Sequence, residues 1–182
     1  DSNERYIEIP LDENLTPQEN AQKYFRKYSK AKTAYAYASE QLKISRRELD
    51  YLENVLYSLE ETDSIDNIEE IREELRNQGY IRKANVKRKN HAKPEPLTFT
   101  SSEGYQIWVG RNNAQNDELT LKFAKPEDLW LHTKNIPGSH VIARVPDSIP
   151  DKTLLEAAAI AAWFSKARNS SKVQVDYTKV KY

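Results

Sequence analysis

The chain has 182 residues, of which 38% are hydrophobic, 31% are charged and none is cysteine or methionine, and its formal net charge is zero. This composition is too polar for one compact globule and predicts an elongated, solvated part beside a small globular domain. The lack of cysteine excludes a disulfide framework and thiol chemistry, and no apolar run reaches the ~20 residues of a membrane span. No N-terminal signal segment is visible. Because the first residue is Asp1 and not methionine, we expect a fragment or a processed product, read here as a piece of a longer protein.

The zero net charge conceals strong segregation along the chain. Residues 48–74 hold eleven acids and one base, residues 79–94 hold six bases and no acid, and residues 166–182 hold five bases and one acid. Basic segments attract phosphate backbones, anionic lipids or acidic proteins. Two interpretations stay open: these segments are binding surfaces, or they are a solvated linker and a solvated tail.

A long helix is predicted over about residues 17–61. Thr16 and Glu19 form a capping-box signature, with Pro17 at the first helical position. Small and apolar residues then recur at alternating spacings of three and four, which is typical of a heptad coiled-coil seam ~65 Å long. This seam consists of Ala21, Tyr24, Tyr28, Ala31, Tyr35, Ala38, Leu42, Ser45, Leu49, Leu52, Leu56 and Leu59.

A second helix is predicted over residues 64–78, with Gly79 as its C-terminal stop. The short connection between the helices predicts an antiparallel coiled-coil hairpin over residues 1–79, in which the second helix covers the leucine-rich half of the seam. The tyrosine- and alanine-rich half then needs another partner. We expect a helix from a missing N-terminal part, with self-association of two chains or packing on the globular domain as alternatives.

Residues 80–96 are predicted to be a basic linker, and residues 97–182 a small mixed domain, so that the fold class is α+β. Alternating apolar residues predict strands at residues 97–101, 105–110, 129–133, 140–145 and 173–182. A short helix is favoured over a strand for residues 119–124, and an apolar face predicts a helix over residues 151–167. That face consists of Leu154, Leu155, Ala158, Ala159, Ala162, Trp163 and Ala167.

His132 and His140 are equidistant from the turn between two predicted strands, and are therefore expected to be cross-strand neighbours. Three uses stay open for them: a pair that binds phosphate or a base edge, a hairpin pair with satisfied nitrogens, and, least favoured, the start of a metal site. Ser139 and His140 point to opposite faces of a strand, so they do not form a nucleophile–base pair. No catalytic motif and no phosphate-binding glycine loop is present, so we expect neither an enzyme nor a cofactor.

The stretch from Arg111 to Asp117 is rich in amides and follows directly on a predicted strand. Such groups bind phosphate, ribose or base edges, or else cap the next helix. We expect Asn116 to be the cap, while Arg111, Asn112 and Asn113 are free to contact a ligand. Trp108, Trp130 and Trp163 are expected in the core rather than as stacking platforms for bases.

Three stretches resemble the fibronectin-binding protein A and RqcH-like family, whose eukaryotic members are the NEMF-type quality-control factors. EGYQIWVGRNNAQNDELTLKFA and DLWLHTKNIPGSHVIARV resemble its C-terminal NFACT-R domain, and IEIPLDENLTPQENAQKYFRKYSKAK resembles the entry to its middle coiled coil. The resemblance implies an RNA-binding module. Such proteins bind large ribosomal subunits obstructed by peptidyl-tRNA, recruit tRNA and promote C-terminal alanine tailing. The family's N-terminal NFACT domain and a later glycine-rich segment have no counterpart here.

Two functions follow as hypotheses. The first is a cytoplasmic RNA- and ribosome-binding module, for which the expected contacts are Lys87, Arg88, Lys89, Arg111, Asn112, Asn113, His132, Lys134 and His140. The second follows from streptococcal-type members of the family, which are described as surface adhesins. It is a fibronectin-binding fragment at the bacterial cell surface, without membrane insertion.

Overall fold

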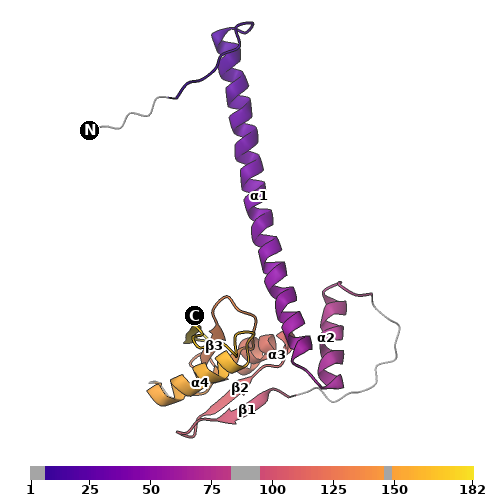
Figure 1. Cartoon of the computed structure of the whole chain (residues 1–182), viewed down its shortest axis with the longest axis vertical. Helices are drawn as coiled ribbons and strands as arrows, with labels where there is room; N and C mark the ends of the chain where they lie inside the picture. Colours follow the sequence, from indigo (N-terminus) through magenta and orange to yellow (C-terminus); the bar gives the residue numbers. More distant parts are fainter. Residues whose placement is uncertain (1–6, 83–94, 146–148) are drawn as a thin grey trace, which may run out of the picture. The chain divides into compact units, whose positions relative to one another are not determined.

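The computed structural model of the chain describes residues 7–82, 95–145 and 149–182 (Figure 1). It divides into two compact units, residues 1–48 and residues 49–182. The helix α1 (Pro17–Glu60) belongs to both, since the boundary falls within it. The prediction of a long helix over about residues 17–61 is therefore confirmed.

The start of α1 has the predicted capping box. The Thr16 backbone N–H donates to Glu19 Oε2 at 2.8 Å, and the Glu19 N–H donates to Thr16 Oγ1 at 3.3 Å. The hydrogen bond from the Thr16 backbone lowers the pKa of Glu19. In the first turn of the helix, the buried Asn20 side chain accepts from the Asp12 N–H and donates to the Asp12 carbonyl. These bonds fix the turn that leads into α1.

The predicted coiled-coil hairpin is not confirmed. The leucines at the end of the seam, Leu49, Leu52, Leu56 and Leu59, are 54%, 37%, 52% and 39% exposed. In the second unit the buried side of α1 consists instead of Val55, Tyr57 and Ser58. The expectation that the second helix covers the leucines is wrong, because the helix is buried through a different face. A partner helix or a second chain on the exposed seam stays a prediction.

The helix α2 (Ile65–Asn77) runs beside the end of α1 within the second unit (Figure 1). Its Ile71 is 1% exposed, whereas Ile65 is 72% exposed. After α2, Tyr80 stacks on Tyr51 of α1 with a centroid distance of 5.7 Å. The α2 backbone ends near the predicted Gly79, which adopts a φ of 87° that favours glycine.

The globular domain is built on a five-stranded antiparallel sheet. Its strand order is β1-β2-β4-β3-β5. The strands are β1 (Leu97–Thr100), β2 (Gln106–Val109), β3 (Leu129–Thr133), β4 (Val141–Ala143) and β5 (Val175–Lys179). All five predicted strands are present, and the α+β class is confirmed.

One face of the sheet carries the hydrophobic core under the helix α4 (Asp151–Trp163). Ile107, Val109, Leu129, Leu131 and Val141 from the sheet pack with alanines of α4. The predicted apolar face of this helix is wrong in detail. Its buried residues are Thr153, Ala157 and Ala161, whereas Leu155 and Trp163 are 70% and 62% exposed.

The other face of the sheet carries α3 (Asn113–Glu118) and the π-helical turn η1 (Leu119–Phe123). The helix favoured for residues 119–124 is thus confirmed as helical, in π form. Trp108 of β2 meets Phe123 at 4.9 Å between ring centroids, and the Arg144 guanidinium lies over both rings. Arg144 also makes a bidentate contact with the buried Asp128. Trp108 and Trp130 are half-buried on this face.

Candidate nucleic-acid interface

The segment after β2 places its side chains differently from the expectation. Asn112, not Asn116, is the N-cap of α3, and its Oδ1 accepts from the Gln115 N–H at 2.9 Å. Asn112 is 2% exposed, and its Nδ2 donates to Glu70 of α2 at 2.7 Å. The prediction of Asn116 as the cap was wrong because the chain turns one helical turn earlier. Asn112 is therefore a structural residue, buried away from any ligand surface.

Glu70 also accepts from Gln115 Nε2 at 2.9 Å, so two buried amides of the domain hold one carboxylate of α2. A third link joins α1, where Asn54 Oδ1 accepts from the Gly138 N–H at 3.0 Å. Arg168 forms an ion pair with Glu61, just after α1. These bonds fasten the end of α1 and α2 to the globular domain within the second unit.

Asn116 is buried beneath the histidine pair. Its Oδ1 accepts from the His140 N–H at 2.9 Å, and His140 Nδ1 lies 2.9 Å from Thr120 Oγ1. His132 and His140 are cross-strand neighbours as predicted, with ring centroids 5.4 Å apart. Trp130 stacks on His132 at 5.8 Å and meets the edge of His140 at 5.2 Å.

Both imidazoles are held neutral at physiological pH. Burial lowers the pKa of His132, and burial together with the neighbouring His132 lowers the pKa of His140 to about 4. Neutral rings do not attract phosphate electrostatically, so hydrogen bonding to a base edge is the binding role that remains a prediction. Among the residues that the structure describes, no group of three or more metal-ligating side chains is formed.

The histidines open onto a cavity of about 300 Å³ with an acidic lining. The lining residues are Tyr51, Asn54, Glu74, Gln78, Asn113, Asn116, Asp117, His132, Gly138 and His140. Burial raises the pKa of Glu74. Hydrogen bonds with Tyr51, the Ala114 backbone and Asn113 lower this pKa, but burial is the larger effect. With two carboxylates and no lysine or arginine in this lining, the cavity disfavours phosphate. Asn113 lies here, so its predicted contact with an RNA backbone has no support from its surroundings.

A second cavity, of about 420 Å³, lies where the end of α1 and the α1–α2 turn face one end of the sheet. Its lining residues are Tyr57, Ser58, Glu61, Thr62, Asp63, Ser64, Asn67, Leu97, Gly110, Arg111, Ser139 and Phe164. Arg111 is exposed at this cavity, while its backbone N–H donates to Gln115 Oε1 at 3.1 Å. The expectation that Arg111 is available to a ligand is consistent with this placement.

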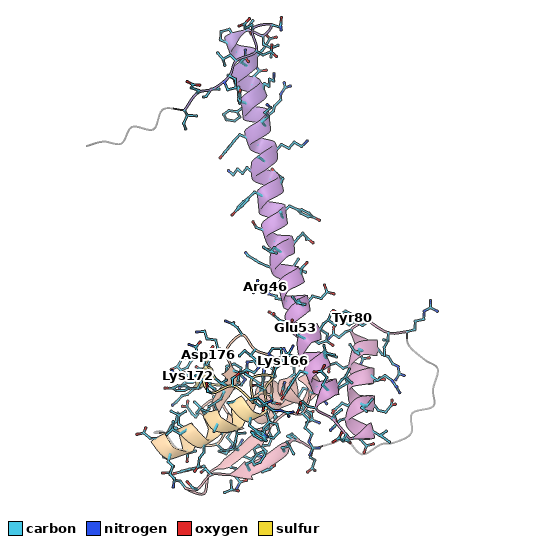
Figure 2. All side chains as sticks on the ribbon, in the orientation of Figure 1. Arg46, Glu53, Tyr80, Lys166, Lys172 and Asp176 are labelled. Carbon is cyan, nitrogen blue, oxygen red and sulfur yellow. The ribbon has the colours of Figure 1, made fainter. Side chains whose placement is uncertain are left out.

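Exposed cations lie on two loops that meet at the end of the sheet where β3 leaves it. Backbone hydrogen bonds join the β3–β4 loop to the α4–β5 loop: Lys134 N to Gln174 O, and Lys166 N to Pro137 O, both at 2.9 Å. We call the four exposed cations of these two loops, Lys134, Lys166, Arg168 and Lys172, the basic loop surface. Figure 2 labels Lys166, Lys172 and Asp176 on the globular domain.

The remaining cations of the C-terminal segment are engaged elsewhere. Lys179 and Lys181 pair with Glu127 at 2.7 and 2.8 Å, and hydrogen bonds from the two ammonium groups lower the pKa of Glu127 to about 2. Within the basic loop surface, Lys134 lies 3.8 Å from Asp176 and Arg168 pairs with Glu61. Of the predicted contacts, the structure thus assigns only Lys134 to this surface. The excess of bases in residues 166–182 was the available signal for the other three.

The predicted contacts Lys87, Arg88 and Lys89 lie outside the described residues. They stay predictions, as does the basic character of the whole linker as a binding surface.

The fold defines a small α+β domain with exposed cations on two adjoining loops, and comparison with known proteins gives its family. Residues 96–181 match the NFACT protein RNA binding domain, and residues 1–94 match the NFACT N-terminal and middle domains. The chain belongs to the NFACT family.

Relatives within this family cover nearly the whole chain. It is 48% identical over 180 residues to the Rqc2 homolog RqcH of Bacillus subtilis, covering 97% of this chain and 31% of that protein. It is 43% identical over 176 residues to the Rqc2 homolog RqcH of Streptococcus suis, covering 96% of this chain and 32% of that protein. The predicted resemblance to RqcH-like proteins is confirmed, and the chain spans about a third of these curated relatives.

A solved structure gives the same result. It is the structure of the C-terminal of the fibronectin/fibrinogen-binding protein from Streptococcus suis. The TM-score is 0.78 at 42% sequence identity, covering 93% of this chain and 68% of that chain. In the part of the chain that the structure describes, no helix is both long enough and apolar enough to cross a membrane.

Proposed function

We propose that this chain is the RNA-binding part of a ribosome quality-control factor that binds obstructed large ribosomal subunits. The observation that carries the proposal is the basic loop surface, on a domain that matches the NFACT RNA-binding family. The names of the RqcH relatives support the assignment to ribosome quality control. Recruitment of tRNA and C-terminal alanine tailing are proposed for the longer protein, with a cytoplasmic location and a binding rather than catalytic role.

The four cations suit a phosphate backbone for a physical reason. They come from two adjacent loops at one end of a rigid sheet, and Lys166 and Lys172 are exposed. Each phosphate that a lysine or arginine neutralises releases condensed counterions, so that binding weakens steeply with salt. For single strands the logarithm of the binding constant falls with the logarithm of salt concentration by roughly 0.7 per phosphate contact.

The test is RNA binding measured by fluorescence anisotropy over a series of salt concentrations. We expect the triple variant K134E/K166E/K172E to lose at least about tenfold in affinity and to show a shallower salt dependence. The matched control is K122E/K125E, which changes exposed lysines of and beside η1, on another part of the domain. Salt-insensitive binding, or an equal loss in both variants, would contradict the proposed surface.

A second candidate function rests on the structural neighbour named for fibronectin and fibrinogen binding. We propose it as an alternative that is compatible with the first, because one fold can carry both activities. Surface plasmon resonance of fibronectin over the immobilised chain tests it. Saturable binding that survives K134E/K166E/K172E would support a separate adhesive surface, and absence of saturable binding would remove this candidate.

A further inference from the structure

The cavity of about 420 Å³ beside Arg111 is not used by the basic loop surface. Its walls come from three parts of the second unit: the end of α1, the turn into α2, and the end of the sheet at Gly110 and Ser139. Its volume exceeds that of one planar heterocycle and is at the lower end of the range for small-molecule sites.

Contacts within the second unit hold the turn that forms one wall of this cavity. The turn is held on one side by the ion pair between Glu61 and Arg168. Inside the turn, Thr62 Oγ1 accepts from Asn67 Nδ2 at 3.1 Å and from the Ser64 N–H at 3.3 Å. A preformed site loses less conformational entropy on binding than one that must be ordered by its ligand.

The floor of the cavity is apolar and aromatic, and one polar atom near it lacks a hydrogen-bond partner in the described part of the chain. Tyr57, Leu97 and Phe164 provide the apolar surface. Asn67 is 5% exposed, and its Oδ1 is buried with no hydrogen-bond partner among the described residues. A buried amide oxygen without a partner is costly in a folded protein, so a ligand that donates a hydrogen bond to it gains affinity.

The charges around the cavity balance. Arg111, Glu61 and Asp63 line it, and Arg168 neutralises Glu61 from outside. A phosphate site would carry an excess of cations, whereas this lining suits a neutral planar group with hydrogen-bonding edges. Burial raises the pKa of Tyr57 to about 12, so its phenol is neutral at physiological pH and adds no charge to the lining.

We propose that this cavity receives one unstacked nucleobase of a single-stranded RNA, with Asn67 bonding its edge. The inference rests on the proposed RNA-binding function and adds a base-binding site to it. The Asn67 amide oxygen offers an acceptor to a donor group of a base, and proteins that recognise RNA commonly splay single bases onto aromatic surfaces. Arg111 at the cavity and Arg168 behind it lie where the adjoining phosphates are expected.

The test compares RNA decamers that contain bases with a decamer of the same length made of abasic ribose phosphates. The four homopolymers rA, rC, rG and rU serve as probes in fluorescence anisotropy. We expect Asn67→Ala to weaken the best-bound homopolymer roughly fivefold to tenfold, the loss of about one hydrogen bond. The abasic decamer should be unaffected. Asn77→Ala is the matched control, because Asn77 is an exposed asparagine on the same helix.

A second measurement does not depend on the stability of a variant. A decamer that carries one photoactivatable 4-thiouridine is crosslinked to the unmodified chain, and the attached residues are mapped by mass spectrometry. Crosslinks to Tyr57 or Phe164 are expected. Salt-dependent RNA binding with crosslinks only elsewhere, and with equal affinity of Asn67→Ala for all probes, would overturn the base site and leave RNA binding standing. Failure of the chain to bind any RNA would overturn both.

Discussion

The carboxylate of Glu70 on α2 accepts a hydrogen bond of 2.7 Å from the buried Nδ2 of Asn112, the residue that caps α3. A second bond of 2.9 Å comes from Gln115 to the same oxygen. One acidic side chain of the helical region therefore satisfies two buried amides of the globular domain.

Replacing Glu70 by alanine should destabilise the second unit by about 1.5–3 kcal/mol, the usual effect of removing a charged hydrogen-bond partner from buried groups. Glu70→Gln should cost less, because both bonds end on one oxygen and the amide oxygen of glutamine can accept both, without the charge. Urea unfolding followed by circular dichroism measures both. The neighbouring Glu69→Ala, which removes a surface ion pair with Arg72, should cost under about 1 kcal/mol. Equal losses at the two sites would contradict the fastening role of Glu70.

His140 should make the fold sensitive to acid. Its pKa is lowered to about 4, below the 6.5 of an ordinary histidine, so the unfolded chain binds a proton more readily than the folded chain. Stability is therefore fully present above about pH 6.5 and falls as pH decreases toward 4, by about 3 kcal/mol in total. Glu74, whose pKa is raised, acts in the opposite direction at the acid end.

Because His140 and Glu74 have opposite effects on stability as the pH falls, the pH dependence of the wild-type chain is compared with that of a His140 variant. The free energy of unfolding of the wild-type chain and of His140→Asn is determined between pH 7 and pH 4. Asparagine places a polar atom near the position of Nδ1, which faces Thr120 at 2.9 Å. The variant should lose less stability on acidification than the wild type, and parallel curves would contradict the assignment to His140.

Shortening the Arg144 side chain, which pairs with Asp128, should lower the stability of the fold. The Asp128 side chain is 4% exposed. The Arg144 guanidinium forms an ion pair with it and also lies over the rings of Trp108 and Phe123. Arg144→Met leaves a buried carboxylate without its cation and should cost about 3–5 kcal/mol. Arg144→Lys keeps the charge but not the two-pronged contact, so an intermediate loss is expected. Thermal unfolding ranks the variants, and an order with lysine worst would be inconsistent with this account.

Replacing Gly110 by any other residue should destabilise the domain for a steric reason. A Cβ at this position would lie 2.2 Å from Asn116 Oδ1, the atom that accepts the His140 N–H. Gly110→Ala should therefore cost roughly 1–3 kcal/mol and shift the His140 imidazole signals in NMR spectra. Gly104→Ala is the control, because Gly104 has a φ of 87° and open space around it. It should cost about 1 kcal/mol through backbone strain alone and leave the His140 signals in place.

The sheet was predictable because its strands alternate. Leu129 and Leu131 face the core while Trp130 faces α3, and the symmetry of the intervening turn was enough to pair His132 with His140. The identity of the cap was not predictable, since Asn112 and Asn116 are the same residue type one helical turn apart. Their partners distinguish them: Asn112 bonds to Glu70, 42 positions away, whereas Asn116 accepts from the His140 N–H.

The helical region shows a different limit. Its heptad pattern identifies an apolar stripe but not the element that covers it. A hydrogen bond between the domain and α1 is made by Asn54, a polar residue outside the seam. The loops that carry Lys134 and Lys166 meet because Lys166 N–H donates to Pro137 O and Lys134 N–H donates to Gln174 O. The proximity of these two loops depends on tertiary contacts, which the order of residues along the chain does not reveal.

Trp163 ends α4 only three residues before Lys166 and is 62% exposed, whereas Trp108 and Trp130 are half-buried. An indole in water emits at longer wavelength than a buried one and is accessible to soluble quenchers such as iodide. The chain therefore carries an intrinsic fluorescent reporter next to the basic loop surface. Ligand binding there should shield Trp163 from iodide, so that occupancy can be followed by light emission without attaching a dye.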